Sequence, residues 1–388
     1  MKFSEIAYER VDLEGWSARA VELTERLRYA ASVEKAEQVI REDHELEGLT
    51  IQSMRTVAQI RHDIDTRDAF YEDEMTFYNR ELPKYRHLGQ AWTKALLVSP
   101  YRRELEEKYG GVTLRNAEIS SRTFKPKLVE DLQKENELVP HKLSVDDDKR
   151  RAAWRAEGQW FRDNGKELDR IFDELVALRD RMGRKLGHDG YTRLGYDRMK
   201  RNCYTEKDVE QFRIAVQTYI VPLCKRINMD RAKRMGFAFP MSFADKDLAF
   251  RSGNPKPAGS TADILAAGTR FYSELSPETK EFWNLMMERE MMDVESKPGK
   301  AAGGYCTGIY AAKMPFIFTN FNGTAHDAKV ITHEAGHAFA LYLNMDRVMG
   351  MLPSMEACEV HSMAMEFFAD NWAELFLGTM PTSPATPI

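Results

Sequence analysis

The chain has few cysteines and no long apolar run. Its four cysteines lie far apart, without the short spacing of a zinc-ligand pair or a redox motif: Cys203, Cys224, Cys306 and Cys358. Each is therefore expected to be a small buried apolar residue in a reducing compartment, which favours the cytoplasm. No stretch approaches the ~18 uninterrupted apolar residues of a membrane span. The first ten residues also lack the apolar core of a secretory signal.

Positive charge is not in excess either. The formal net charge is −5, so the sequence lacks the electrostatic signature of a nucleic-acid-binding protein. Basic clusters such as Lys149–Arg151 are interleaved with acids, which is typical of solvated helix faces. We therefore expect neither a nucleic acid nor a membrane among the partners.

What the chain does have is length and helical periodicity. Its 388 residues, 43% of them hydrophobic, allow two domain-sized units and a large core. Apolar residues recur at helical spacing in most of the chain. The segments expected to be helical are Trp16–Asp43, Thr50–Asn79, Gly89–Tyr109, Arg150–Leu186, Glu206–Met235 and a helix from Ser276–Pro277 to Met292. The acidic run Asp146–Asp148 predicts a boundary near residue 145, hence an N-terminal helical domain (1–145) and a second domain (146–388).

One segment departs from the helical pattern. Met314–Asn322 is rich in β-forming residues and is bounded by glycines, which predicts a strand. Such a strand could pair with an extended peptide by main-chain hydrogen bonds, or it could be an ordinary strand of the core. In the first case Asn320 and Asn322 are candidates to orient the substrate.

The most informative stretch is His333-Glu334-Ala335-Gly336-His337. Residues four apart on a helix share a face, so both imidazoles can bind one metal ion. Glu334 lies about 100° round the helix from His333, where it can reach a metal-bound water and not the metal itself. The flanking residues are largely apolar, and buried imidazoles need polar partners or a metal.

The start of this helix also carries a signal. Thr324 is the expected N-cap, and Asp327 falls in the first turn, where the helix dipole favours an anion. Asp327 is either a solvated charge or an outer partner of a ligating histidine.

A third ligand is needed, because a catalytic zinc site normally has three protein ligands and one open position. A histidine six residues after His337 is excluded, since Leu343 stands there. A later helix, expected from Met355 to Leu377, offers four candidates: Glu356, Glu359, His361 and Glu366. Helix geometry alone does not choose among them, because Glu356 and Glu359 share a face and Glu366 follows Glu359 by one heptad.

These motifs resemble the zinc site of the oligoendopeptidase F and thimet oligopeptidase group of metallopeptidases. In that family a Glu-x-x-Ser-x-x-x-Glu run supplies the third zinc ligand from its first glutamate, and Glu359–Glu366 matches it. The resemblance implies one zinc ion bound by His333, His337 and Glu359, with Glu334 as general base and Glu366 as an outer partner. Four further stretches match the family: Phe70–Tyr78, Asp293–Lys300, Gly303–Cys306 and Pro315–Thr324.

The resemblance also implies a fold and an activity. The expected fold is mainly α, an elongated multi-helix zincin-type metallopeptidase with a small β element before the metal-binding helix. The expected activity is hydrolysis of short cytoplasmic peptides by a zinc-dependent endopeptidase. The sequence does not indicate its oligomeric state or the residues it prefers beside the cut.

The end of the chain departs from the family. Members continue with a long helical stretch that brings tyrosine and histidine donors to the oxyanion, whereas here a tail, Thr379–Ile388, follows the third-ligand helix. The catalytic domain is therefore expected to be C-terminally truncated. This leaves a second interpretation open, a truncated homologue that binds zinc or peptides without turnover. A purely structural helical protein would require the pentapeptide and Glu359 to coincide by chance.

Overall fold

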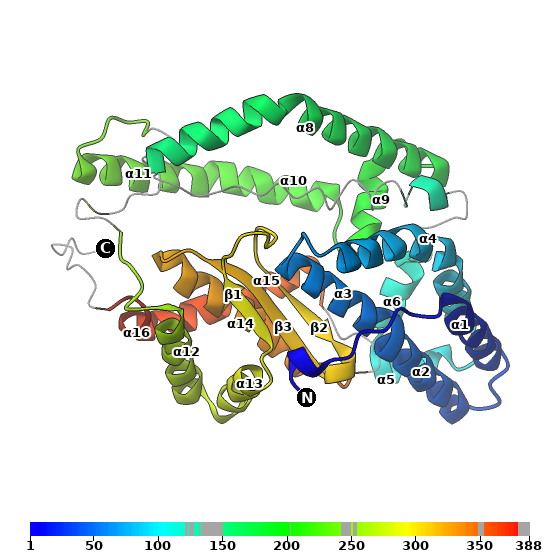
Figure 1. Cartoon of the computed structure of the whole chain (residues 1–388). Coiled ribbons are helices and arrows are strands. Elements are labelled where there is room, and N and C mark those ends of the chain that lie inside the picture. Colours follow the sequence, from blue (N-terminus) through cyan, green and yellow to red (C-terminus); the bar gives the residue numbers. More distant parts are fainter. Residues whose placement is uncertain are drawn as a thin grey trace.

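The computed structural model describes residues 1–120, 123, 128–131, 133, 150–201, 203–241, 250, 254–347 and 353–378. The molecule is mainly helical and contains one small sheet (Figure 1), which confirms the expected fold class. The boundary near residue 145 and the tail 379–388 fall outside the described residues, so the division into two domains stays a prediction.

The N-terminal region is a group of helices on one side of the sheet (Figure 1). They are α1 (Leu13–Arg28), α2 (Val33–Glu47), α3 (Ser53–Ile64), α4 (Ala69–Leu97), α5 (Arg102–Tyr109) and α6 (Gly111–Ser120). The segments predicted to be helical are confirmed as mainly helical, although Trp16–Asp43, Thr50–Asn79 and Gly89–Tyr109 are each divided between successive helices. Ser32 and Asp68 cap the helices that follow two of the breaks, since their side chains accept hydrogen bonds from main-chain amides of α2 and α4.

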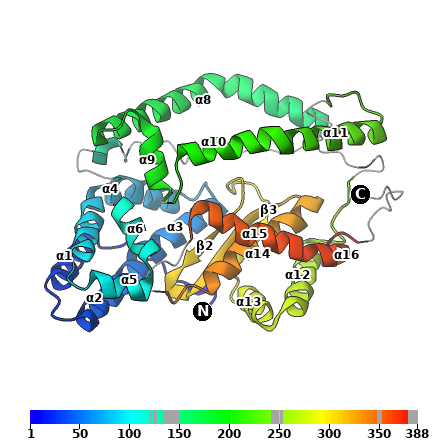
Figure 2. The ribbon, with the colours of Figure 1, turned by 180° about the vertical axis from the view of Figure 1, so that it is seen from behind.

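A pair of long helices lies along the top of the molecule in both views (Figures 1 and 2). The first is α8 (Arg150–Leu186), followed by the short α9 (Tyr191–Arg198). The second is formed by α10 (Glu206–Ala215), the π-helical turn η4 (Val216–Ile220) and α11 (Val221–Met235), and we call it the arm. The predicted helices at 150–186 and 206–235 are confirmed.

The sheet lies at the centre of the molecule and has three strands (Figure 1). They are β1 (Met292–Glu295), β2 (Tyr305–Ile309) and β3 (Met314–Phe321), in the order β1-β3-β2. β1 runs parallel and β2 antiparallel to β3. The strand predicted at 314–322 is thus real, but both of its edges are already paired, which corrects the idea that it receives a peptide.

Helices from the second half of the chain cover the sheet. α12 (Thr261–Leu275) and α13 (Pro277–Glu288) pack beside it, and α14 (Ala325–Tyr342) follows β3 directly. α13 begins at Pro277 as expected but ends at Glu288, because β1 starts at Met292. The predicted helix from Met355 to Leu377 is broken into α15 (Met355–Ala369), η6 (Asp370–Trp372) and α16 (Ala373–Leu377).

One apolar core joins the sheet to these helices. Phe316 and Phe318 of β3 are fully buried in it, together with Phe271 of α12, Trp283 of α13 and Ala335 of α14. The burial of these large side chains is the main source of stability in this part of the molecule. It fixes α14, and therefore the histidines, against the sheet.

Hydrogen bonds join the N-terminal helices to the sheet. The Tyr305 hydroxyl of β2 donates to Asp63 Oδ2 of α3 over 3.0 Å, and the Ala301 amide donates to the Asp63 carbonyl over 2.8 Å. The Ala311 amide donates to Ser53 Oγ over 2.8 Å. α3 therefore holds β2 together with the residues before and after this strand.

Two expectations, one about membrane spans and one about the cysteines, can be checked on the described residues. None of the helices described here has an apolar stretch long enough to cross a bilayer. All four cysteines are free. Cys203 and Cys224 are exposed, so the expectation of buried cysteines was wrong for these two, whereas Cys306 and Cys358 are partly buried. Cys224 is exposed because it lies on the arm, whose surface is mostly open to solvent.

Candidate metal centre

The candidate site lies where α14 and α15 approach each other most closely. Gly336 of α14 allows this approach, because a Cβ built on it would lie 2.7 Å from the His361 carbonyl oxygen and 2.7 Å from Ser362 Cα. Any larger residue would push the two backbones apart. The missing side chain of Gly336 thus brings the histidines of α14 within reach of the acids of α15.

His333, His337 and Glu359 form a compact group in this contact. His333 Nε2 lies 3.3 Å and His337 Nε2 3.6 Å from Glu359 Oε2. One potential ligand atom of each residue lies within 4.8 Å of the others. The two imidazole rings are nearly perpendicular, at 84°, with their centroids 4.9 Å apart. Both Nε2 atoms therefore face the same carboxylate oxygen.

Each histidine is also held by a second contact from α15. His333 Nδ1 lies 2.7 Å from Glu366 Oε1, and the other oxygen of Glu366 lies 3.2 Å from Lys329 Nζ. His337 makes a hydrogen bond to the main chain of Cys358. Burial lowers the pKa of His337, which outweighs the opposing effect of Glu359. His337 is accordingly favoured in the neutral form that metals bind.

Glu359 is the most exposed member of the group. About half of its side chain, 51%, is open to solvent, whereas His333 and His337 are 27% and 19% exposed. The Ser362 hydroxyl donates to Glu359 Oε2 over 2.9 Å and so orients the carboxylate toward the imidazoles.

Glu334 lies beside this group and differs from the other acids in its surroundings. It is only 8% exposed, and burial raises its pKa to about 7, with His333 lowering it and Glu359 raising it further. Among the described residues, no donor makes a hydrogen bond to its carboxylate. Glu334 Oε1 would lie 3.6 Å from a Cβ built on Gly304, directly before β2. This carboxylate can therefore accept or release a proton near neutral pH.

The donor set fits a zinc ion. Two imidazoles and one carboxylate are the ligands of many catalytic zinc sites, which keep a further position open. An outer hydrogen bond to each ligating histidine, as Glu366 and Cys358 make here, fixes the ring orientation in such sites.

Comparison with known proteins identifies the family. Residues 3–124 match the peptidase M3 N-terminal domain, and residues 278–379 match peptidase family M3. An oligoendopeptidase F structure from Bacillus anthracis str. Ames superimposes with a TM-score of 0.93 and 36% identity, covering 97% of this chain and 74% of that chain. The chain belongs to peptidase family M3.

Two further solved structures support the assignment of this M3 peptidase. A second oligoendopeptidase F is 38% identical, with a TM-score of 0.93, and PZ peptidase A, solved with an inhibitor, is 37% identical, with a TM-score of 0.91. In both cases 97% of this chain and 71% of the other chain are covered. No curated protein matches the sequence.

The structure of this M3 peptidase separates the four candidates for a third ligand. Glu359 lies in the group with the histidines, and Glu366 contacts His333 from outside. Glu356 instead forms an ion pair with Arg201 at 2.7 Å, and His361 is exposed on α15. The family motif thus indicated a choice that helix periodicity could not make.

Three other predicted site residues are used elsewhere, which corrects the expectations for them. Asp327 is buried and accepts hydrogen bonds from the amides of Asn322 and Gly323 at 2.8–3.2 Å, so it closes the turn before α14 and does not contact a histidine. Asn320 donates to the carbonyls of Ala301 and Gly303, and Asn322 accepts from the Thr324 hydroxyl. Both asparagines shape loops, because they lie at the end of a strand whose edges are paired.

Sequence reasoning missed one positioning residue, Lys300. Its side chain is fully buried, and its ammonium donates to Asp293 Oδ1 and to the carbonyls of Asp293, Glu295 and Thr319. It also lies 4.5 Å from the centre of the Phe318 ring. Lys300 thereby holds β1 to β3 and fixes the loop that leads to Gly304. The sequence signal that could have found it is its place in the stretch Asp293–Lys300, which matches the family.

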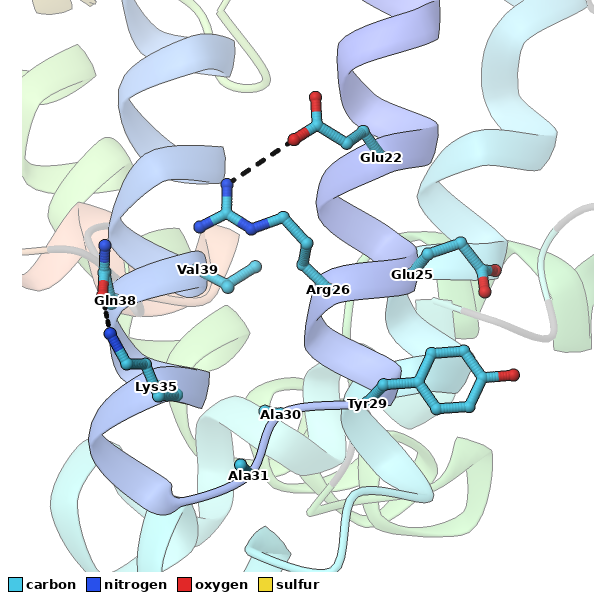
Figure 3. A pocket seen from close by; sticks show the side chains of 9 residues that line it. All are labelled: Glu22, Glu25, Arg26, Tyr29, Ala30, Ala31, Lys35, Gln38 and Val39. Atoms are coloured by element: carbon cyan, nitrogen blue, oxygen red, sulfur yellow. Dashed lines mark hydrogen bonds and ion pairs between the residues drawn. The ribbon is translucent and has the colours of Figure 1, made fainter.

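An open pocket elsewhere in the molecule lies between α1 and α2 (Figure 3). Arg26 points toward Glu22, at 3.8 Å, and Lys35 donates to Gln38 over 3.2 Å. Tyr29 points away from these pairs (Figure 3). Solvated ion pairs of this kind contribute little to the stability of the fold. None of the residues that line this pocket belongs to the metal group.

Proposed function

We propose that this M3 peptidase is a zinc-dependent endopeptidase that cleaves short peptides. His333, His337 and Glu359 would hold the zinc ion, and Glu334 would act as general base. The observation that carries the proposal is the convergence of two imidazoles and one carboxylate beside a buried acid. A reducing, cytoplasmic location and short peptides as substrates remain part of the proposal.

The chemistry is divided between the metal and the protein. A zinc ion held by these residues would supply a Lewis acid, which lowers the pKa of water far below its ordinary value and polarises a carbonyl group. Glu334 accepts the proton of the attacking water and passes it to the leaving amine. The desolvation that raises the pKa of Glu334 to about 7 suits both steps, since the group can take and return a proton at neutral pH.

The peptide main chain is proposed to lie along β2. β2 is an edge strand that pairs only with β3 in the described sheet. Gly304, directly before it, lies next to Glu334. An extended peptide added to this edge would gain main-chain hydrogen bonds without requiring one sequence. The edge of β2 thus takes the role that the sequence suggested for β3, because both edges of β3 are paired within the sheet.

The test is the variant Glu334→Gln. We expect it to retain close to one equivalent of zinc while cleavage of a quenched peptide falls to background, because the general base is removed and the ligands remain. Glu359→Gln should lose zinc as well as activity. Glu356→Gln on the same helix should keep both. Near-normal turnover by Glu334→Gln would refute the assignment.

A zinc- or peptide-binding protein without turnover is the second candidate. It is favoured by the half-exposed Glu359. Zinc content together with cleavage measured with and without a chelator separates the two. Stoichiometric zinc with no chelator-sensitive cleavage would identify the second.

A further inference from the structure

Arg55 of α3 has no partner, unlike many other arginines of the N-terminal helices. Arg10, Arg26 and Arg67 each form an ion pair with a carboxylate. In the part of the chain that the structure describes, no hydrogen bond or ion pair involves the guanidinium of Arg55. An arginine normally presents its N–H donors to a carboxylate or a phosphate group. The donors of Arg55 are therefore available to a ligand.

The surroundings of Arg55 lie between those of a surface residue and those of a core residue. Its side chain is exposed, so solvent and solutes can reach it. Desolvation by the surrounding protein nevertheless lowers the pKa of its guanidinium, and Tyr78 of α4 opposes that shift. The group stays charged at neutral pH, because arginine is not deprotonated in proteins. A charge that is partly surrounded by protein attracts an opposite charge more strongly than one on an open surface.

α3 runs alongside β2 in the opposite direction. Near the start of the helix, Ser53 Oγ accepts a hydrogen bond from the Ala311 amide, which follows β2. Near the end of the helix, Asp63 Oδ2 accepts one from the Tyr305 hydroxyl, at the start of β2. In both views α3 lies on the β2 side of the sheet (Figures 1 and 2). A peptide paired with the edge of β2 would therefore pass along α3.

Arg55 lies on the ridge of α3 that leads to β2. Arg55, Gln59 and Asp63 follow one another at intervals of four residues, which places them along one ridge of the helix. Asp63, at the end of this ridge, contacts Tyr305 of β2. Gln59 is half-buried and Arg55 is exposed, so the ridge opens to solvent toward the start of the helix. The Arg55 end of the ridge is not used by the core.

The helical rise gives the position of Arg55 along a bound peptide. Arg55 precedes Asp63 by eight residues, which is about 12 Å at a rise of ~1.5 Å per residue. Asp63 lies at the level of Tyr305, and Gly304 before it lies beside Glu334. An extended peptide advances about 3.3 Å per residue. Arg55 would therefore meet a group about four residues from the bond next to Glu334.

We propose that Arg55 binds a carboxylate of the peptide about four residues from the cut bond, and so determines which short peptides are preferred. The carboxylate belongs to an acidic side chain or to the C-terminus of the peptide. The planar guanidinium holds it by parallel N–H···O bonds, with the Gln59 amide as a neighbouring donor. This inference rests on the proposed function and on the placement of the peptide along β2.

Peptide binding tests the inference in the chain that carries Glu334→Gln, which should bind peptides without cutting them. Fluorescence anisotropy compares three kinds of labelled, N-acetylated peptide. The first is neutral and amidated, the second carries one glutamate at each position in turn, and the third is the neutral peptide with a free C-terminal carboxylate. We expect one glutamate position or the free carboxylate to bind roughly tenfold or more tightly than the neutral peptide, since hydrogen bonds to charged groups contribute that much.

Substitutions of Arg55 should change this preference and nothing else. Arg55→Gln should bind every peptide about as weakly as the parent chain binds the neutral one. Arg55→Lys should retain part of the preference, because it keeps the charge and loses the planar fork of donors. The matched control is Arg41→Gln, since Arg41 is exposed on α2, and it should leave the preference unchanged. With Glu334 restored, Arg55→Gln should raise KM for the preferred peptide and leave kcat unchanged.

The outcomes separate this inference from the proposed function. The inference alone is overturned if the neutral peptide binds and no carboxylate improves binding, or if Arg55→Gln keeps the preference. Binding that depends on Arg55, without any cleavage by the chain with Glu334 restored, would support the inference and contradict the catalytic role of the metal group. Absence of all peptide binding would overturn both. Unchanged zinc content and circular dichroism of each variant exclude misfolding as the cause.

Discussion

At the residue scale, the candidate site depends on how each histidine divides its two ring nitrogens. His333 directs Nε2 to Glu359 and Nδ1 to Glu366, and His337 directs Nε2 to Glu359 while it hydrogen-bonds the Cys358 main chain. The outer contact fixes the tautomer and the orientation of each ring. A side chain that does not bind the metal can therefore affect how tightly the metal is bound.

Glu366→Gln tests the effect of such an outer contact at one ring nitrogen, His333 Nδ1. Because the carboxylate beside His333 Nδ1 is lost, zinc affinity should fall about 10- to 100-fold. The fold should remain intact. Competition with a fluorescent zinc chelator measures the affinity, and Glu356→Gln is the control on the same helix. Unchanged affinity in Glu366→Gln would show that the contact has no effect on the site.

At the scale of elements, the contact between α14 and α15 depends on Gly336. Gly336→Ala would place a Cβ 2.7 Å from the His361 carbonyl and 3.0 Å from Met365 Cβ, so one helix must move. Alanine favours a helix by about 1 kcal/mol over glycine, but crowding in a packed core costs about 1–3 kcal/mol. We expect lower stability and weaker zinc binding.

Gly89→Ala is the control for this prediction. Gly89 lies inside α4, and a Cβ there would meet nothing within 4 Å. The same substitution should therefore stabilise the protein by about 1 kcal/mol through helix propensity. Urea unfolding measures both variants. If Gly336→Ala were as stable as Gly89→Ala and bound zinc normally, close approach of the helices would not matter.

The sheet depends in a similar way on Lys300. Lys300→Met removes the buried ammonium and leaves Asp293 and three carbonyl groups without that donor, which should cost about 3 kcal/mol of unfolding free energy. Lys297→Met is the control, because Lys297 forms an ion pair with the same Asp293 at 3.0 Å but is 44% exposed. Exposed ion pairs contribute little to the free energy of unfolding. Equal effects in chemical unfolding would contradict the role of Lys300.

At the scale of the whole molecule, distant segments are joined by a few buried polar contacts. The carboxylate of Glu74 on α4 is almost fully buried, and Arg10 and Tyr8 donate hydrogen bonds to it. Burial alone would raise the pKa of Glu74, but the hydrogen bonds from Arg10 and Tyr8 and the charge of Arg10 outweigh burial and lower it. The N-terminal segment is thus tied to α4 by an ionised acid.

Acid should weaken this tie in a defined pH window. Because the pKa of Glu74 is lower in the folded state, its stabilisation is present above the unfolded value, about 4.3, and disappears as the pH falls through the folded value. Glu74→Gln should cost about 1.5–3 kcal/mol at pH 7 and progressively less below pH ~4. Urea titrations at several pH values measure the difference in the free energy of unfolding between this variant and the wild type. Glu9→Gln, exposed on the same segment, is the control, and a pH-independent loss would contradict the argument.

The helices were predictable where local signals were unambiguous. Periodicity alone gave 150–186 and 206–235, because the first is one helix and the second continues through the π-helical turn η4 without leaving the helical conformation. It did not mark the breaks before Ser32 and Asp68, where a side chain caps a new helix while the apolar pattern continues. β1 and β2, four and five residues long, gave too little pattern and depend on pairing with β3.

The chain by itself determined the family, the mainly helical class and the paired histidines with Glu334, because spacing on one helix and a family motif are local properties. Only the tertiary structure showed that Glu356 pairs with Arg201 and not with the histidines, and that β3 is paired on both sides while β2 lies at an edge of the sheet. It also assigned Asp327, Asn320 and Asn322 to turns and loops. These outcomes depend on how two helices and a sheet pack, and packing brings together residues whose separation along the chain carries no information about distance.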